Sequence, residues 1–224
     1  MKFYTINGSP RKERNTAQIL KKVESGFYDK VHEELPNENI ELNFINLYSL
    51  NFTGCRSCFS CKRLNGRSYG HCIIKDDLYG ILKDLETADA MVLGSPIYLM
   101  DVTGEMRSFL ERLIFQYLVY DKNHSTLAEN RLPIACIYTM NIKKEDYDNY
   151  TLKYTLNNME SFISRIFSKV YSLKIFDTYQ FKDYSKFENS LFDEREKLKQ
   201  KLSQFPNDLN EAYILGRNLA SDVI

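Results

Sequence analysis

The chain has 224 residues, of which 43% are hydrophobic, and its 30 basic residues equal its 30 acidic ones in number. That length suits one domain with a substantial core, and that composition excludes disordered and fibrous classes of protein. The balanced charge provides no basic field for nucleic acid, and no apolar run approaches the ~20 residues of a membrane helix, so we expect neither nucleic-acid nor membrane partners.

The first residues, MKFYTINGSP, lack the basic, apolar and small-residue order of a signal peptide and already read as a strand. We therefore expect a cytoplasmic protein. Because the cytosol keeps thiols reduced, clustered cysteines in such a chain indicate metal binding or redox chemistry before structural disulfides. Four of the five cysteines lie between residues 55 and 72.

Strands and helices alternate along the chain. The stretch 2–6 is rich in β-formers and stops at the turn signal NGSPR, after which Thr16, Leu20, Val23 and Phe27 follow at helical spacing. The same patterns predict further strands at 40–47, 89–96, 133–140 and 171–181, and helices at 76–88, 102–116, 149–170, 190–204 and 207–221.

This alternation predicts an α/β fold with right-handed crossovers between parallel strands. Five strands at this spacing fit a flavodoxin-like doubly wound sheet of order 2-1-3-4-5 with helices on both faces, whose ligands bind beyond the carboxyl ends of the strands. The polar stretch 182–190 suggests a boundary. We expect one domain at 1–181, with a cysteine loop at 53–76, and a C-terminal helical extension of the same domain at 182–224.

The loop NGSPRKERNTAQ (7–18) leads from the first strand into the first helix. The helix N-terminus, the hydroxyls of Ser9 and Thr16, and the positive charge of Arg11 suit a phosphate group. A dinucleotide fingerprint and a P-loop are both missing. We therefore expect a monophosphate site, and the alternative is an ordinary turn in which Thr16 caps the helix.

The loop GSPIYLMDVTGEM (94–106) follows the third strand. Ile97, Tyr98 and Leu99 would form an apolar wall, which is unusual for a surface loop unless something flat covers it. The helix N-terminus near Gly104 would stabilise the negative charge of a reduced flavin. The alternative is that these side chains pack against a neighbouring loop or subunit and that Asp101 caps the helix.

The cysteine loop leaves three interpretations open. Cys55, Cys58 and Cys61 are three residues apart, and Cys72 follows a gap of ten residues. Three thiolates in one compact loop plus a fourth nearby match the ligands of a cubane iron–sulfur cluster. Zinc would suit four thiolates, or three with His71. The third interpretation is a loop of free or disulfide-forming thiols without any metal.

GSPRKERNT together with GSPIYLMDVTGEMRSFLERL resembles the NADPH-dependent FMN reductase family, and the cysteine loop resembles that of its iron–sulfur flavoprotein branch. The closing FPNDLNEAYILGRNLA resembles the terminal helix of that group. The resemblance covers roughly residues 1–115 and the C-terminus, and the gap before Cys72 is longer than is usual in the branch.

The resemblance implies FMN held between the first and second loops and NADH or NADPH as electron donor. The cysteine loop follows the second strand on the ligand side of the sheet, so we expect it to lie near the flavin edge. The resemblance places the FMN phosphate against Ser9, Arg11, Asn15, Thr16 and Ala17. It places the isoalloxazine ring along Pro96, Ile97, Tyr98, Leu99, Asp101 and Gly104, with Thr139 and Asn141 on the other side. A 4Fe-4S cluster would take Cys55, Cys58, Cys61 and Cys72 as ligands.

The function expected from this reading is an FMN-dependent oxidoreductase, with the chemistry carried by the flavin and no acid–base triad. It would transfer electrons from a reduced nicotinamide or protein donor to a small acceptor or redox partner, and assemble as a homodimer or homotetramer. The rival is an electron-transfer or redox-sensing module without a dedicated substrate. Turnover of a small acceptor with NADH or NADPH would distinguish the two.

Overall fold

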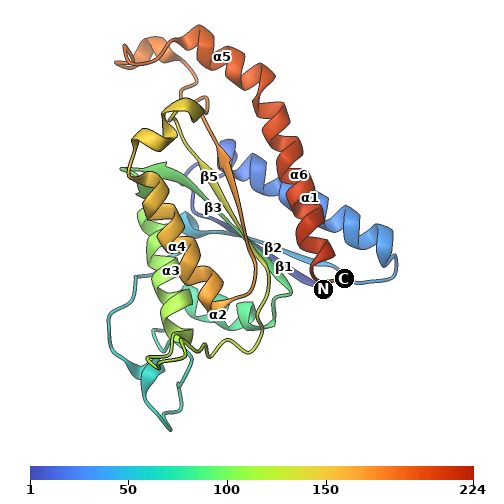
Figure 1. The fold of residues 1–224 in the computed structure, drawn as a ribbon, viewed down its shortest axis with the longest axis vertical. Coiled ribbons are helices and arrows are strands. Elements are labelled where there is room, and N and C mark those ends of the chain that lie inside the picture. The colour runs from blue at the N-terminus through green and yellow to red at the C-terminus, as the bar shows by residue number, and fades with distance from the viewer.

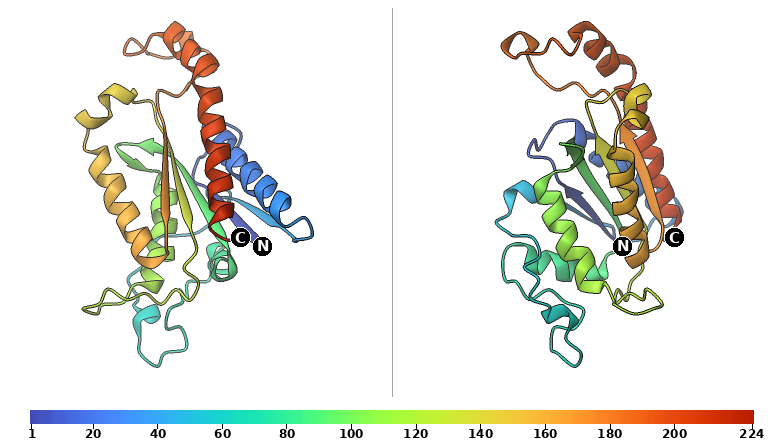
Figure 2. Two further views of the ribbon diagram at one scale, coloured as in Figure 1. Left: turned by 45° about the vertical axis from the view of Figure 1, so that its right-hand side comes forward. Right: turned by 60° about the vertical axis from the view of Figure 1, so that its left-hand side comes forward.

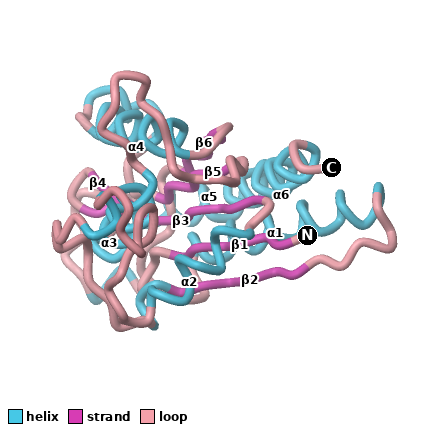
Figure 3. Tube along the Cα trace, turned by 90° about the horizontal axis from the view of Figure 1, so that it is seen from below, coloured by secondary structure: helices cyan, strands magenta, loops and turns pink.

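A twisted parallel sheet forms the centre of the molecule in the computed structural model, which describes residues 1–224 (Figure 1). Five parallel strands lie in the order β2-β1-β3-β5-β6, and Figure 3 shows them stacked in that order. They are β1 (Lys2–Asn7), β2 (Glu41–Asn46), β3 (Ala90–Tyr98), β5 (Ile134–Thr139) and β6 (Val170–Ile175). The short β4 (Asp101–Val102) pairs antiparallel with β3. The predicted order of five parallel strands is confirmed.

Helices cover both faces of the sheet, as predicted for a doubly wound fold (Figure 2). On one face lie α1 (Asn15–Glu34) and α6 (Phe205–Ser221), and on the other lie α2 (Leu78–Asp84), α3 (Gly104–Tyr117) and α4 (Leu152–Ile166). The helix α5 (Glu194–Ser203) stands beyond the end of the sheet. Short 3₁₀ helices occupy Leu47–Ser49, Ser60–Lys62, Leu85–Thr87, Lys144–Asn149 and Tyr184–Lys186.

The last strand is shorter than the expected 171–181. β6 ends at Ile175 because Asp177 adopts a left-handed backbone conformation (φ 50°) that turns the chain. The amides of Asp177 and Thr178 then donate to the carbonyls of Ile142 and Met140. Residues 176–181 consequently run across the carboxyl end of the sheet instead of extending it.

The helix expected at 102–116 begins two residues late, at Gly104. Thr103 is its N-cap and accepts a hydrogen bond from the amide of Met106, while Val102 belongs to β4. Such a capping hydroxyl satisfies one of the amides that the first turn leaves unpaired. None of the helices is both long enough and apolar enough to cross a membrane.

The expected apolar face of the first helix is confirmed. Thr16, Leu20, Val23 and Phe27 are all buried on α1. All six residues of β5 are buried, which is expected for a central strand covered on both faces. The free energy that holds the sheet therefore comes from apolar surface on its two sides.

The predicted C-terminal extension contains two different parts. α6 packs directly on α1, and its residues Ala212, Leu219 and Ala220 share a core with the sheet. Gly26 on α1 and Gly216 on α6 sit at the crossing, where an added Cβ would overlap the backbone of the other helix. α5, in contrast, has a single buried residue, Lys197.

Candidate functional site

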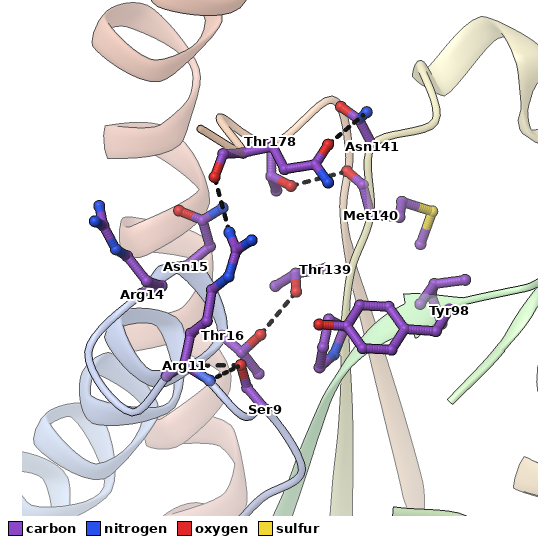
Figure 4. Close-up of a pocket in the computed structure, with 13 residues that line it drawn as sticks. Ser9, Arg11, Arg14, Asn15, Thr16, Tyr98, Thr139, Met140, Asn141 and Thr178 are labelled. Atoms are coloured by element: carbon purple, nitrogen blue, oxygen red, sulfur yellow. Dashed lines mark hydrogen bonds between the residues drawn. The ribbon is translucent and has the colours of Figure 1, made fainter. Parts of the chain in front are cut away.

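A cleft opens at the carboxyl ends of β1, β3, β5 and β6, which is where ligands bind in open α/β sheets (Figure 4). Its enclosed volume is about 90 Å³, which is smaller than most small-molecule sites, so a ligand of that class would extend beyond its mouth. Nine of the residues expected to contact FMN line it, namely Ser9, Arg11, Asn15, Thr16, Pro96, Ile97, Tyr98, Thr139 and Asn141.

The loop before α1 keeps the N-terminus of that helix available for an anion. The N-cap residue of α1 is Arg14, and no side chain caps the first turn. Thr16 does not cap the helix, because its hydroxyl lies 2.8 Å from that of Thr139 across the cleft. The buried Ser9 accepts a hydrogen bond from the amide of Arg11. Uncapped amides beside hydroxyls and a guanidinium suit a phosphate group.

The segment after β6 closes the cleft on the side away from β3. Arg11 donates to the carbonyl of Gln180 at 2.8 Å (Figure 4). Asn15 donates to the carbonyl of Tyr179 at 3.1 Å. Thr178 and Gln180 line the cleft together with Arg14 and Met140, and none of these four was among the predicted contact residues. The polar residues that follow the apolar residues of β6 are the sequence feature that could have identified this segment as part of the cleft.

The second loop contributes less of its length to the cleft than expected. Leu99 and Met100 have positive φ angles of 50° and 62°, which turn the chain back from β3 into β4. As a result the side chain of Leu99 is fully exposed. Asp101 pairs with Arg107 at 2.6 Å and caps no helix. Leu99, Asp101, Gly104 and the buried Ala17 all lie outside the lining of the cleft.

Thr103 fixes the first and second loops to each other, a role that the sequence analysis missed. Its hydroxyl donates to the carbonyl of Gly8 at 2.7 Å, and its amide donates to the hydroxyl of Ser95 at 3.0 Å. Thr103 is fully buried. An added Cβ on Gly8 would overlap Met106, so the first loop can approach α3 closely only with glycine there.

The cysteine loop does not lie beside the cleft of the same chain. The expectation that it borders the flavin edge is therefore wrong for a single chain. The loop hangs at the far end of α3, opposite the carboxyl ends of the strands (Figures 1 and 2). Arg112, a fully buried residue of α3, is one of the residues that hold the loop there. Its guanidinium donates to the carbonyls of Thr53 and Ile74 and to the carboxylate of Asp76, so it ties both ends of the loop to α3.

The four clustered cysteines nevertheless converge on one small cavity beside α3. Cys55, Cys58, Cys61 and Cys72 all line it, together with Arg112 and Gln116. Two buried nitrogen atoms of these α3 residues, Arg112 Nε and Gln116 Nε2, have no hydrogen-bond partner. Unpartnered buried donors are costly and suit an acceptor-rich or anionic group in the cavity.

The thiols differ in their ionisation. Burial is the main cause of the raised pKa of Cys61; Lys62 opposes the shift, whereas Cys72 and the other loop thiols add to it. Hydrogen bonds from the amide and hydroxyl of Ser60 lower the pKa of the exposed Cys58. Cys136 is buried in β5, as expected of a core residue, and burial raises its pKa to about 12.

The structure shows no site for a single metal ion around this cavity. No three His, Cys, Asp or Glu side chains lie close enough together to hold one. His71 is paired with Glu86 at 2.8 Å and does not line the cavity. Zinc needs four ligands around one ion, whereas each thiolate of a cubane cluster binds a different iron atom. The four thiols match the ligand set of a cluster in number and kind.

About half of the chain is similar to curated iron–sulfur flavoproteins. It is 34% identical over 112 residues to one from Archaeoglobus fulgidus, which covers 50% of this chain and 48% of that protein. It is 30% identical over 120 residues to one from Clostridioides difficile, covering 52% and 48%. The matched part thus spans about half the length of these relatives.

Solved structures share the fold over nearly the whole chain. An NAD(P)H:quinone oxidoreductase from Methanothermobacter marburgensis superposes with a TM-score of 0.69 at 14% identity, over 98% of this chain and 96% of that one. An FMN-dependent NADH-azoreductase from Bacillus anthracis, solved with FMN, gives 0.60 at 16% identity, over 98% and 99%. The model of the NADPH-dependent FMN reductase family matches residues 1–141, which include every loop of the cleft except the segment after β6, and the chain belongs to that family.

Proposed function

We propose that the chain binds FMN in this cleft and acts as an FMN-dependent oxidoreductase that takes electrons from NADH or NADPH. The observation that carries the proposal is the uncapped N-terminus of α1, which faces Ile97 and Tyr98 across one cleft. A phosphate and a flat ring joined by a polar chain match these two sides. Family membership and the FMN-bound structure with the same fold support the same ligand.

The residues present divide into two groups by chemistry. Ser9, Arg11, Asn15 and Thr16 offer the donors and positive charge that hold a phosphate. Pro96, Ile97 and Tyr98 offer an apolar wall for the ring, and the loop after β5, with Thr139 and Asn141, approaches from the other side. FMN, when bound, would accept a hydride from the nicotinamide and pass electrons on singly or as a pair.

The identity of the flavin tests the proposal directly. Cofactor released by heat from the purified protein should chromatograph as FMN, and FAD in its place would contradict the proposal. Arg11→Ala and Thr16→Val should each weaken FMN binding by roughly tenfold or more, because each removes a hydrogen bond to a charged group. Lys12→Ala is the matched control, since Lys12 neighbours Arg11 but does not line the cleft.

The electron donor and acceptor are tested by turnover. We expect the FMN-loaded protein to oxidise NADH or NADPH in the presence of a quinone, a nitroaromatic compound or free flavin. Two of the solved structures that share the fold carry the names of quinone and azo-compound reductases, which supports small aromatic acceptors. Absence of turnover with either nicotinamide, while a protein donor still reduces the flavin, would contradict the enzyme and favour an electron carrier.

The proposal includes an assembly of two or four chains in the cytoplasm. The exposed Leu99 and half-exposed Tyr98 stand at the rim of the cleft, where a second copy would cover them. Light scattering of the FMN-bound protein at micromolar concentration should therefore show a dimer or tetramer. A monomer under these conditions would contradict this part of the proposal and leave the FMN site untouched.

The cysteine cavity favours a second function, the relay of electrons through a 4Fe-4S cluster held by Cys55, Cys58, Cys61 and Cys72. Its support is the convergence of four thiols and two unpartnered donors on one cavity, and the names of the curated relatives. Anaerobically purified protein should contain about four irons and matching sulfide per chain. Any single Cys→Ser change in the loop should then remove the iron and leave the flavin. No iron after reconstitution would contradict the relay.

A further inference from the structure

α5 stands away from the sheet, and a buried side chain joins it to residues of the cleft. Lys197 is its only buried residue, and its side chain is 3% exposed. The ammonium group donates to the carboxylate of Asp177 and to the side-chain oxygen of Asn141, and it lies 3.5 Å from the carbonyl of Asn141. The ring of Phe192 covers it at 4.9 Å.

These contacts determine which way the amide of Asn141 faces. An ammonium group can only donate hydrogen bonds, so the side-chain oxygen of Asn141 must face Lys197. Its NH₂ group then faces the other way and donates to Gln180 Oε1 at 3.2 Å (Figure 4). Because Gln180 accepts through its oxygen, its own NH₂ group is left free of partners within the chain.

Asn141 and Gln180 both line the cleft, so the orientation of their amides determines which atoms a bound ligand meets. Each presents an NH₂ donor on the side away from Lys197, and the ammonium group polarises the two amides in series. Without Lys197, either amide could rotate by half a turn and present an oxygen instead. An acceptor oxygen of a ligand would then meet another acceptor.

The energetics favour a positioning role over a stabilising one. A buried ion pair is weak support for stability, because removing two charged groups from water offsets most of their attraction. The rest of α5 is exposed or half-buried, so the helix gains little from packing. The Lys197 contacts hold the loop after β5 and the segment after β6 in one arrangement relative to each other.

We propose that Lys197 is a positioning residue of the FMN cleft, which fixes the amides of Asn141 and Gln180 so that both offer hydrogen-bond donors to acceptor oxygens of the flavin. The inference rests on the proposed FMN site. It assigns to α5, a helix outside the match to the family model, a part in forming that site.

The test is a double-mutant cycle on FMN affinity. Lys197→Met should weaken FMN binding about tenfold, the equivalent of about 1.4 kcal/mol. In an Asn141→Ala background the same change should have little further effect, because the side chain it orients is gone. The visible absorption band of bound FMN should also shift in Lys197→Met. Lys199→Met, an exposed change on the same helix, should alter neither quantity.

Each other outcome contradicts a stated claim. Unchanged affinity in Lys197→Met, or an equal loss in both backgrounds, overturns the positioning role. Failure of the unchanged protein to bind FMN overturns the proposed function itself. If Lys197→Met unfolds because Asp177 is left unpaired, the variant Lys197→Met/Asp177→Asn removes both charges, and it should fold and show the same tenfold loss.

Discussion

The two faces of the sheet differ in how closely their helices pack. Where α1 meets α6, the backbones touch at Gly26 and Gly216 and the contact is apolar. On the face of α3 and α4, a groove between the helices leaves Tyr154 76% exposed and Phe162 40% exposed. All four buried side-chain atoms without a hydrogen-bond partner belong to this second face, at Arg112, Gln116, Tyr138 and Tyr147.

The difference indicates where the molecule has room for something else. A contact closed by backbone against backbone can only be structural, because no further group fits there. A face that keeps donors unpaired and aromatic rings exposed is incomplete as it stands. The cysteine cavity lies on the incomplete face, and the cleft at the carboxyl ends of the strands lies at the edge that the two faces share.

The largest loss of stability should follow a change on the face of α3 and α4, where the cysteine loop is attached. Arg112→Leu leaves Asp76 and two carbonyls without their donor, and breaking a buried ion pair costs about 3–5 kcal/mol. Urea denaturation should show this loss in the free energy of unfolding, and hydrogen exchange should increase over residues 51–77. Arg107→Leu on the same helix is the control. Its ion pair with Asp101 is exposed, so we expect a change below about 1 kcal/mol.

The face covered by α1 and α6, here called the closed face, should lose stability when one methyl group is added at the helix crossing. Gly26→Ala places a Cβ against the backbone of Tyr213, and the overpacking should lower the free energy of unfolding by about 1–3 kcal/mol. Gly80→Ala on α2 is the matched control, because nothing lies within 4 Å of a Cβ there. That change should raise stability by up to about 1 kcal/mol through helix propensity. Equal effects at the two glycines would contradict the account of the helix crossing.

The smallest effect concerns a carboxyl group at the edge of the closed face. Burial raises the pKa of Glu24, although the hydrogen bond from Thr5 and the charge of Lys21 oppose the shift. The folded state therefore binds the proton more tightly than the unfolded state, and stability is lost as pH rises through the folded-state pKa. Glu24→Gln should consequently be more stable than the unchanged protein at neutral pH. The gain should disappear below the unfolded-state pKa, and a gain that persists in acid would contradict this cause.

The order of the strands and the position of the cleft could be read from the sequence because local patterns carry both. Alternating periodicities define the elements, and most of the lining residues lie at the carboxyl ends of β1, β3 and β5 or shortly after them. Arg112 and Lys197 could not be found in this way. Their partners lie 20 to 59 positions away along the chain, so that only the folded molecule brings them together.

The position of the cysteine loop also could not be predicted from the sequence. The four thiols of that loop all line one cavity, and their role as one set of ligands stays a prediction. The position of the loop was inferred from the end of β2, which is at the ligand edge. Arg112 overrides that inference by drawing Thr53 and Asp76 to the middle of α3. Residue spacing predicts which groups can converge, whereas tertiary contacts decide where they do so.

The helix crossing at Gly26 and Gly216 also has a consequence for synthesis. The hydrogen bond from Tyr213 to Asp29, beside that crossing, joins residues 184 positions apart. At 5–20 residues per second, a ribosome would need roughly 10–40 s to bring α6 out after α1. During that time Leu20, Val23 and Phe27 lack the cover of α6. Contacts so distant in sequence slow folding, so we expect the nascent chain to depend on chaperones until its last helix emerges.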